Sequence, residues 1–229
     1  MLTIEYLGHS CFTATDGSKT IIIDPYLSSN PLSAASPKDI QADAVLLTHG
    51  HSDHLGDGVQ IAQKNDALVI AGSELAAYCR FQDCRTHAMQ IGGSHDFDFG
   101  TVKMTQATHS SSLIHDDHIV YLGLACGLLI RMGDRVIYHA GDTGLFGDMH
   151  LVGDLNDIEV AMLPIGGNFT MGVDDAVIAA QWLHPVTVVP MHYGTFDTIQ
   201  ADPNEFAAKL AEQNINCTIL NPGEEMQVP

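Results

Sequence analysis

The sequence predicts a four-layer αββα sandwich, in which two β-sheets pack face to face and helices cover their outer faces. Short apolar runs bounded by Gly, Asp, Ser or Pro are typical of strands. Helical stretches follow such runs in both halves of the chain, and layers of this kind share a buried core. The 229 residues suffice for one sizeable core. We therefore expect a single domain over residues 1–229.

The first half combines short β-branched runs with two helical stretches. The run TIIID and the run AVLLTH are each bounded by turn-forming residues, as strands are. The stretches GVQIAQKN and SELAAYCRF flank the apolar run ALVIA, which separates two helices by a strand. The expected strands are residues 2–7, 20–24, 44–49 and 67–71, and the expected helices are residues 58–65 and 73–81.

The second half begins with strands and ends in two helix-then-strand units. The stretch DDAVIAAQWL has apolar residues at helical spacing and leads into the strand TVVPM. The expected strands are residues 101–108, 119–131, 135–139, 158–165 and 187–191, and the expected helices are residues 174–183 and 202–214.

The last helix carries a start signal in its sequence. Asp202 is the expected N-cap, Pro203 occupies the first helical position, and Glu205 stands where a capping box has its acidic residue. The apolar face predicted for this helix consists of Phe206, Ala207, Leu210 and Ala211.

Composition and charge narrow the range of partners. The chain has 28 acidic against 9 basic residues, a formal net charge of −19, which repels nucleic-acid phosphates and anionic membranes. There is no apolar run of about 18 residues, and no signal peptide is visible, so we expect a cytoplasmic protein that acts on a small molecule. Five scattered cysteines indicate reduced thiols. The sequence is compatible with a homo-oligomer and does not specify the oligomeric state.

The stretch LLTHGHSDHLG carries the clearest chemical signal. Directly after an apolar strand it places His49, His51, Asp53 and His54 within six residues. With this composition, the pattern HxHxDH arises by chance in roughly 0.4% of such sequences. Imidazole and carboxylate are ligands for zinc, iron, manganese, cobalt or nickel. The stretch therefore predicts a metal centre at the end of the strand.

One loop offers too few ligands, so further donors are expected from other strand ends. His109 follows VKMTQAT, Asp142 lies in IYHAGDTG, and His192 follows TVVPM. Each comes after an apolar run and is followed within two residues by Gly or Ser, so all three can reach the sheet edge where the HxHxDH loop lies.

The order of these motifs resembles the metallo-β-lactamase superfamily over nearly the whole chain. The resemblance implies an αββα fold with the site at the edge of the sandwich. It further implies two divalent ions, zinc first, with manganese, nickel, cobalt or iron as alternatives. By the same resemblance, Asp24 in IIIDP supports the ligands from behind. One ion would be held by His49, His51 and His109, the other by Asp53, His54 and His192, with Asp142 as the bridge.

Four further stretches resemble a narrower group. YLGHSCF, HAGDTG, PIGGNFTMG and PMHYGTF are similar to stand-alone metal-dependent hydrolases related to L-ascorbate-6-phosphate lactonase. The Asp at position 142 resembles the bridging carboxylate of superfamily members that hydrolyse esters, lactones, thioesters and phosphodiesters. Zinc β-lactamases, in contrast, commonly have Cys in one metal site. The few basic residues disfavour a sugar phosphate as substrate.

The implied mechanism is hydrolysis by a bridging hydroxide. Two divalent ions lower the pKa of a shared water and polarise the scissile carbonyl or phosphoryl group. Asp53 is the candidate catalytic residue, because besides its ligand role it is placed to carry a proton to the leaving group.

Other polar residues have less specific surroundings. His9 in GHS is either bonded to a turn backbone or faces substrate, and Asn168 is either a turn residue or a polar substrate contact. Phe169 or Met171 is a candidate apolar wall of the same loop. His115 and His118 are expected in an exposed polar loop.

Two other functions use related donor sets. A mononuclear iron enzyme similar to persulfide dioxygenases is the first alternative. A diiron reductase of this scaffold usually has a flavodoxin domain and a glutamate in the first motif, and this chain has neither. A non-catalytic metal-binding protein is the second alternative, although such a protein would be expected to have lost ligands.

Overall fold

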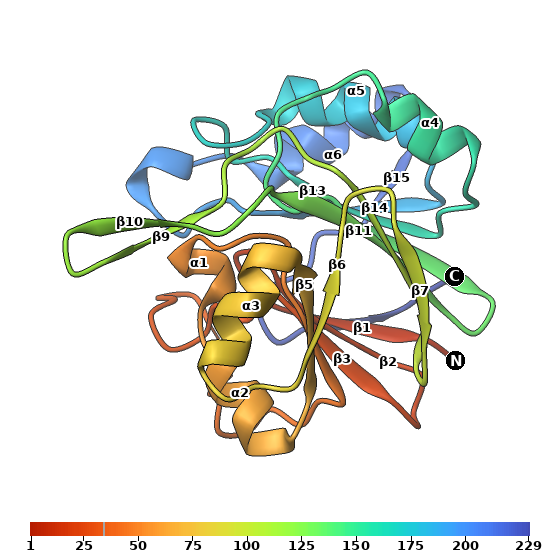
Figure 1. Cartoon of the computed structure of the whole chain (residues 1–229). Coiled ribbons are helices and arrows are strands. Elements are labelled where there is room, and N and C mark those ends of the chain that lie inside the picture. The colour runs from red at the N-terminus through yellow and green to blue at the C-terminus, as the bar shows by residue number, and fades with distance from the viewer. Residues whose placement is uncertain (34) are drawn as a thin grey trace.

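The computed structural model describes residues 1–33 and 35–229, and it has the four-layer αββα arrangement predicted from the sequence. Within the described residues, two seven-stranded sheets pack face to face. Helices α2 and α3 lie on the outer side of the first sheet, and α4, α5 and α6 lie over the outer side of the second (Figure 1). The two chain termini lie near each other at one end of the sandwich (Figure 1).

The first sheet is built mainly by the N-terminal third of the chain, and its strand order is β16-β1-β2-β3-β4-β5-β6. From β3 to β6 the neighbouring strands are parallel. Its strands are β1 (Thr3–Gly8), β2 (Cys11–Thr15), β3 (Thr20–Ile23), β4 (Ala44–Leu46), β5 (Leu68–Gly72), β6 (Thr86–Met89) and β16 (Glu225–Gln227), and its helices are α1 (Ser52–Leu55), α2 (Gly58–Asn65) and α3 (Ser73–Phe81).

The second sheet has the order β15-β14-β13-β12-β11-β8-β7, and it is parallel from β12 to β15. Its strands are β7 (Ser94–Phe97), β8 (Gly100–Gln106), β11 (Cys126–Met132), β12 (Arg135–His139), β13 (Val160–Pro164), β14 (Thr187–Met191) and β15 (Asn216–Cys217), and its helices are α4 (Met149–Asp154), α5 (Val173–Leu183) and α6 (Pro203–Glu212).

Strand alternation explains how the central strands are buried on both faces. In β3, Ile21 and Ile23 join the cluster between the two sheets, whereas Ile22 joins the cluster beneath helices α2 and α3. In β4, Leu46 faces the second sheet, and Val45 faces the helices. Because successive side chains point to opposite faces, a run such as TIII fills two layers at once.

The strand directions bring six strand ends to one edge of the sandwich. β1 and β3 run in the same direction because both are antiparallel to β2, and β4 is parallel to β3. In the second sheet, β8 and β12 run in the same direction because both are antiparallel to β11, and β14 follows β12 through two parallel pairings. The loops after the carboxyl ends of parallel strands meet at one edge.

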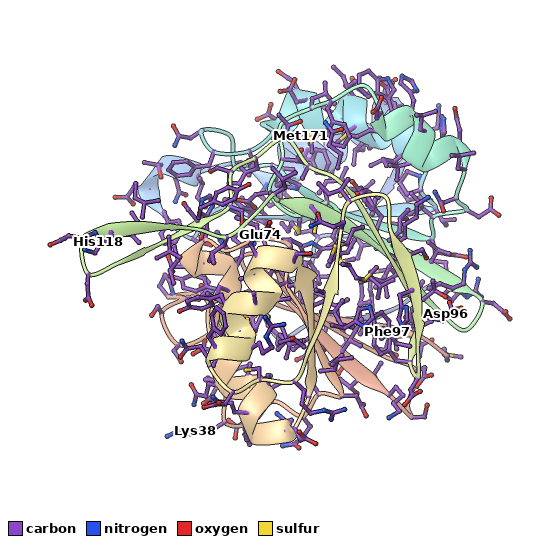
Figure 2. All side chains as sticks on the ribbon, in the orientation of Figure 1. Lys38, Glu74, Asp96, Phe97, His118 and Met171 are labelled. Carbon is purple, nitrogen blue, oxygen red and sulfur yellow. The ribbon has the colours of Figure 1, made fainter. Side chains whose placement is uncertain are left out.

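The expected continuous strand over residues 119–131 is wrong, and the segment around His118 is exposed as expected but forms a hairpin instead of an irregular loop. The chain forms a projecting hairpin of β9 (Ser112–His115) and β10 (His118–Tyr121), and β11 begins only at Cys126. Asp116 and Asp117 have φ of 47° and 61°, the left-handed pair that a two-residue hairpin turn requires. His118 lies at the far end of this hairpin (Figure 2).

Helix α6 begins where the sequence predicted, but fewer of its residues are buried than the four of the predicted apolar face. The Asp202 carboxylate accepts the Asn204 backbone N–H at 2.8 Å, so the N-cap is present. The Glu205 carboxylate pairs with the Lys209 ammonium at 2.8 Å instead of closing a capping box. Ala211 is exposed, because the core-facing stripe of this short helix reaches only Phe206 and Leu210.

All five cysteines are free, as expected for reduced thiols. In the described parts of the chain, each helix is too short or too polar to cross a membrane.

Candidate metal centre

The HxHxDH stretch passes from a buried strand end into a one-turn helix. His49 follows β4 and is buried, His51 is the residue before α1, and α1 carries Asp53 and His54. Gly50 allows this path, because a Cβ at that position would lie 2.5 Å from the Leu122 side chain. The turn thus directs the four donor side chains toward the same edge of the sandwich.

Three histidine nitrogens converge at the first donor group. His51 Nδ1 lies 2.9 Å from His49 Nε2 and 3.2 Å from His109 Nε2. The other nitrogen of His51 lies 3.3 Å from the Ser110 hydroxyl. His109 follows β8, about 55 residues downstream in the chain, so the fold adds the third donor that the motif lacks.

A second donor group lies beside the first. His9, Asp53, His54 and His192 each offer one donor atom, and these atoms all lie within 4.8 Å of one another. His192 follows β14 and is 1% exposed. The HxHxDH stretch therefore contributes donor atoms to both groups.

Asp142, after β12, lies between the two groups. Its Oδ1 is 3.1 Å from His54 Nε2, and its Oδ2 is 3.0 Å from His192 Nε2. The same Oδ2 is 3.5 Å from His109 Nε2 and 4.0 Å from His49 Nε2. One carboxylate thus faces donors of both groups.

Asp24 determines which nitrogen of two histidines faces the centre. Its Oδ2 accepts the His54 Nδ1–H at 2.7 Å and the Thr48 hydroxyl at 2.6 Å, and its Oδ1 accepts the Thr48 backbone N–H at 2.8 Å. Since the Thr48 hydroxyl donates to Asp24, it accepts the Nδ1–H of His49 at 3.0 Å. In their neutral form both histidines therefore turn an unprotonated Nε2 toward a metal, a common function of carboxylates behind metal sites.

The electrostatics of the site suit a cation. Burial lowers the pKa values of His49, His51 and His109, which keeps these imidazoles neutral, as ligation requires. Burial also disfavours a charged His54, but Asp142 and Asp24 outweigh it and raise the pKa of His54 well above its usual range. Two buried carboxylates therefore draw positive charge to this point.

Six buried side-chain polar atoms lack hydrogen-bond partners in the described part of the chain, and four of them belong to the donor groups and Asp142. These four are His54 Nε2, Asp142 Oδ1 and both ring nitrogens of His192. His54 Nε2 and Asp142 Oδ1 are close but lack the alignment of a hydrogen bond. Unpaired buried polar atoms are costly unless something binds them. A metal ion fits these donors.

Three residues of the site have left-handed backbone conformations. His9, Asp24 and His192 have left-handed φ values of 60°, 44° and 55°. Such conformations cost about 1–3 kcal/mol each and cluster at functional sites. The His192 backbone N–H donates to the His9 carbonyl at 2.7 Å, which joins two strained residues from opposite ends of the chain.

The loop around Asn168 forms a tight turn beside the strand end that carries Asp142. Gly167 N–H donates to the Met171 carbonyl, and Met171 N–H donates to the carbonyl of Thr143, next to Asp142. Asn168 and Phe169 are exposed at the tip. Met171 is fully buried in the core, so it is wrong as a substrate-facing wall (Figure 2).

Sequence reasoning missed residues that hold the site from behind. Buried His139 donates its Nε2–H to the Ser10 carbonyl at 2.9 Å and accepts the Gly141 N–H at 3.1 Å, which shapes the turn before Asp142. The Thr195 hydroxyl lies 2.9 Å from His9 Nδ1. The sequence marks His139 and Thr195 only by their position, because each lies three residues from a predicted metal ligand.

Comparison with known proteins identifies the family. The beta-lactamase superfamily domain matches residues 3–192. A UPF0173 metal-dependent hydrolase of Bacillus cereus is 49% identical over 98% of this chain and 99% of its own length, and one of Bacillus cytotoxicus is 50% identical with the same coverage. The solved structure of Igni18, a metallo hydrolase of Ignicoccus hospitalis, has a TM-score of 0.89 at 36% identity, covering 98% of this chain and 97% of that one. The chain belongs to the beta-lactamase superfamily, as a UPF0173 metal-dependent hydrolase.

Proposed function

We propose that this metal-dependent hydrolase works with a dinuclear centre. His49, His51 and His109 would hold the first ion, and Asp53, His54 and His192 would hold the second. The observation that carries the proposal is the position of Asp142, whose two oxygens lie 3.1 Å from His54 and 3.5 Å from His109. A carboxylate placed between two donor groups is suited to bridge two cations.

The bound ions would supply Lewis-acid polarisation of the scissile bond and a hydroxide nucleophile at neutral pH. The protein's own residues determine how the proton reaches the leaving group. Burial raises the pKa of Asp53, but the hydrogen bond with His9 and the charge of His54 outweigh it, so the carboxylate is ionised. Its side chain is 25% exposed, against 3% for Asp142. Asp53 therefore borders the side open to substrate, where it carries a proton to the leaving group.

The proposed substrate is a small molecule with an ester, lactone, thioester or phosphodiester bond. Aromatic rings line one side of the second donor group, where Tyr26 and Phe196 lie 5.6 and 5.5 Å from the His9 ring centre. The net charge of −19 disfavours nucleic acids and anionic membranes as partners. A neutral carbonyl substrate suits these surroundings better than a polyanion.

Metal analysis tests the proposal. Protein purified without added metal or chelator should contain two equivalents of divalent metal, zinc first, because nitrogen and carboxylate donors suit it. The loaded protein should hydrolyse members of a lactone, thioester and phosphodiester panel. One equivalent of iron together with oxygen consumption on persulfides would contradict the dinuclear hydrolase and support the dioxygenase.

Asp53→Asn tests the catalytic role. The amide occupies the same volume but neither carries a proton nor binds a cation as a carboxylate does, so kcat should fall about 10²- to 10⁴-fold. Steady-state kinetics at saturating zinc, with metal content measured on the same samples, separates the two effects. The control is Asp134→Asn, an exposed aspartate in the turn between β11 and β12. Full activity of Asp53→Asn with both metals bound would refute the proton role.

A further inference from the structure

His9 is buried at the centre without a role in the proposed donor set. It follows β1 and is fully buried. Its ring centre lies 4.1 Å from that of His192 and 5.5 Å from that of His54. A ring this close to two candidate ligands is part of the same cluster.

The two nitrogens of His9 face different partners. Nε2 lies 3.1 Å from Asp53 Oδ2, on the side of the second donor group. Nδ1 lies 2.9 Å from the Thr195 hydroxyl, on the opposite side. Metal-binding histidines typically direct one nitrogen to the ion and hydrogen-bond the other to the protein. His9 has this arrangement.

The distances fit a shared ion. One donor atom from each of His9, Asp53, His54 and His192 lies within 4.8 Å of the others. Metal–ligand bonds of about 2.0–2.2 Å place neighbouring ligands of one tetrahedral ion about 3.3–3.6 Å apart and opposite ligands up to about 4.4 Å apart. The four donor atoms can therefore surround one cation after shifts of up to about 1.5 Å in their separations.

The backbone of His9 is an independent observation. Its φ of 60° is a conformation in which glycine or asparagine is less strained than histidine. His192 has a φ of 55°, and its N–H donates to the His9 carbonyl at 2.7 Å. The Tyr6 hydroxyl donates to the same carbonyl at 3.2 Å. Two strained histidines are thus held in matching positions, and one of them is already a proposed ligand.

We infer that His9 is an additional ligand of the second ion, together with Asp53, His54 and His192, and that Thr195 accepts the remaining N–H of its ring. The inference rests on the proposed dinuclear centre. It makes the two metal positions unequal, because the second has one more protein donor than the first. The position of His49, His51 and His109 is then the less crowded one and the one more open to a substrate oxygen.

Metal binding by His9 variants tests the inference. His9→Gln retains an N–H that can donate to Asp53 but removes the imidazole, and His9→Asn tolerates the left-handed backbone. Affinities for two zinc equivalents are measured by competition with a chromophoric chelator, and cadmium-113 spectra report each site's ligands. His118→Ala, on the exposed hairpin, is the matched control (Figure 2). Circular dichroism of the metal-free proteins checks folding.

Both His9 variants should bind one zinc equivalent about 10- to 100-fold more weakly than the wild type does. Their affinity for the other equivalent should be unchanged. One cadmium resonance should shift, and His118→Ala should match the wild type. Wild-type affinities and unmoved resonances in His9→Gln would overturn the inference and leave His9 as a hydrogen-bond donor to Asp53. If the wild type binds one ion, the dinuclear proposal fails, and unchanged affinity of His9→Gln for that ion overturns this inference as well.

Discussion

At the scale of single residues, Asp24 organises the centre through one buried carboxylate. It accepts hydrogen bonds from His54 and from the hydroxyl and backbone N–H of Thr48, and Thr48 in turn holds His49. The carboxylate thereby directs a ligand nitrogen of each donor group toward the ions. A residue outside the HxHxDH motif thus controls two residues inside it.

Replacing Asp24 should weaken metal binding without removing a ligand. In Asp24→Asn the amide cannot accept from both His54 and Thr48 as a carboxylate does, so zinc affinity should fall about 10- to 100-fold. Chelator competition measures the change. Asp57→Asn is the matched control, because Asp57 accepts the backbone N–H groups of Leu27 and Ser28 away from the donor groups. Wild-type zinc affinity in Asp24→Asn would contradict the role assigned to Asp24.

The cysteine thiols should be unreactive in the folded protein. Burial raises the pKa of Cys79 to about 12 and that of Cys217 to about 11, and it raises the pKa of Cys126 further. Because the thiolate is the reactive form, labelling at pH 8 should be slow until the chain unfolds, when all five thiols react. A thiol-exchange colour assay with and without denaturant measures this. Rapid labelling of the native protein would contradict it.

At the scale of elements, helix α6 shows how burial follows geometry more closely than residue type. Phe206 is fully buried against the second sheet, whereas Ala211 is exposed although it lies on the predicted apolar face. Phe206→Ala should therefore lower the free energy of unfolding by about 3–5 kcal/mol. Ala211→Lys should change it by less than about 0.5 kcal/mol. Urea unfolding measures both, and a large loss in Ala211→Lys would contradict the observed orientation.

Elements with a strong local pattern were predictable, and those formed by distant pairing were not. The strand at residues 135–139 and the helix at residues 73–81 appear with the predicted bounds. Strands β2, β6, β7, β15 and β16 were missed, because they are short and depend on pairing with neighbouring strands. The β9–β10 hairpin was missed because its Asp-Asp turn reads equally as a polar loop.

At the scale of the whole molecule, the metal centre joins the two halves of the sandwich. Asp24, His49 and His54 come from the first sheet, and Asp142 and His192 from the second. The 2.7 Å hydrogen bond from His192 to His9 connects the same halves directly. Binding of the ions should therefore stabilise the entire fold.

Metal removal should lower the melting temperature in a single step. A ligand at 100 times its Kd stabilises by about 2.7 kcal/mol per site, which corresponds to roughly 5–10 °C for a chain of this size. Calorimetry with excess zinc and with a chelator measures the difference. The transition should stay single if residues 1–229 form one domain, as expected. Two separated transitions, or no dependence on zinc, would contradict this prediction.

The sequence by itself determined which chemistry is present and on which strands it lies. HxHxDH, His109, Asp142 and His192 are visible because donors at the ends of apolar runs form a local pattern. Only the tertiary structure decided how they combine. His9 meets Asp53, which is 44 residues away, and Thr195, which is 186 residues away. Contacts of this range depend on strand order and direction, which no local pattern encodes.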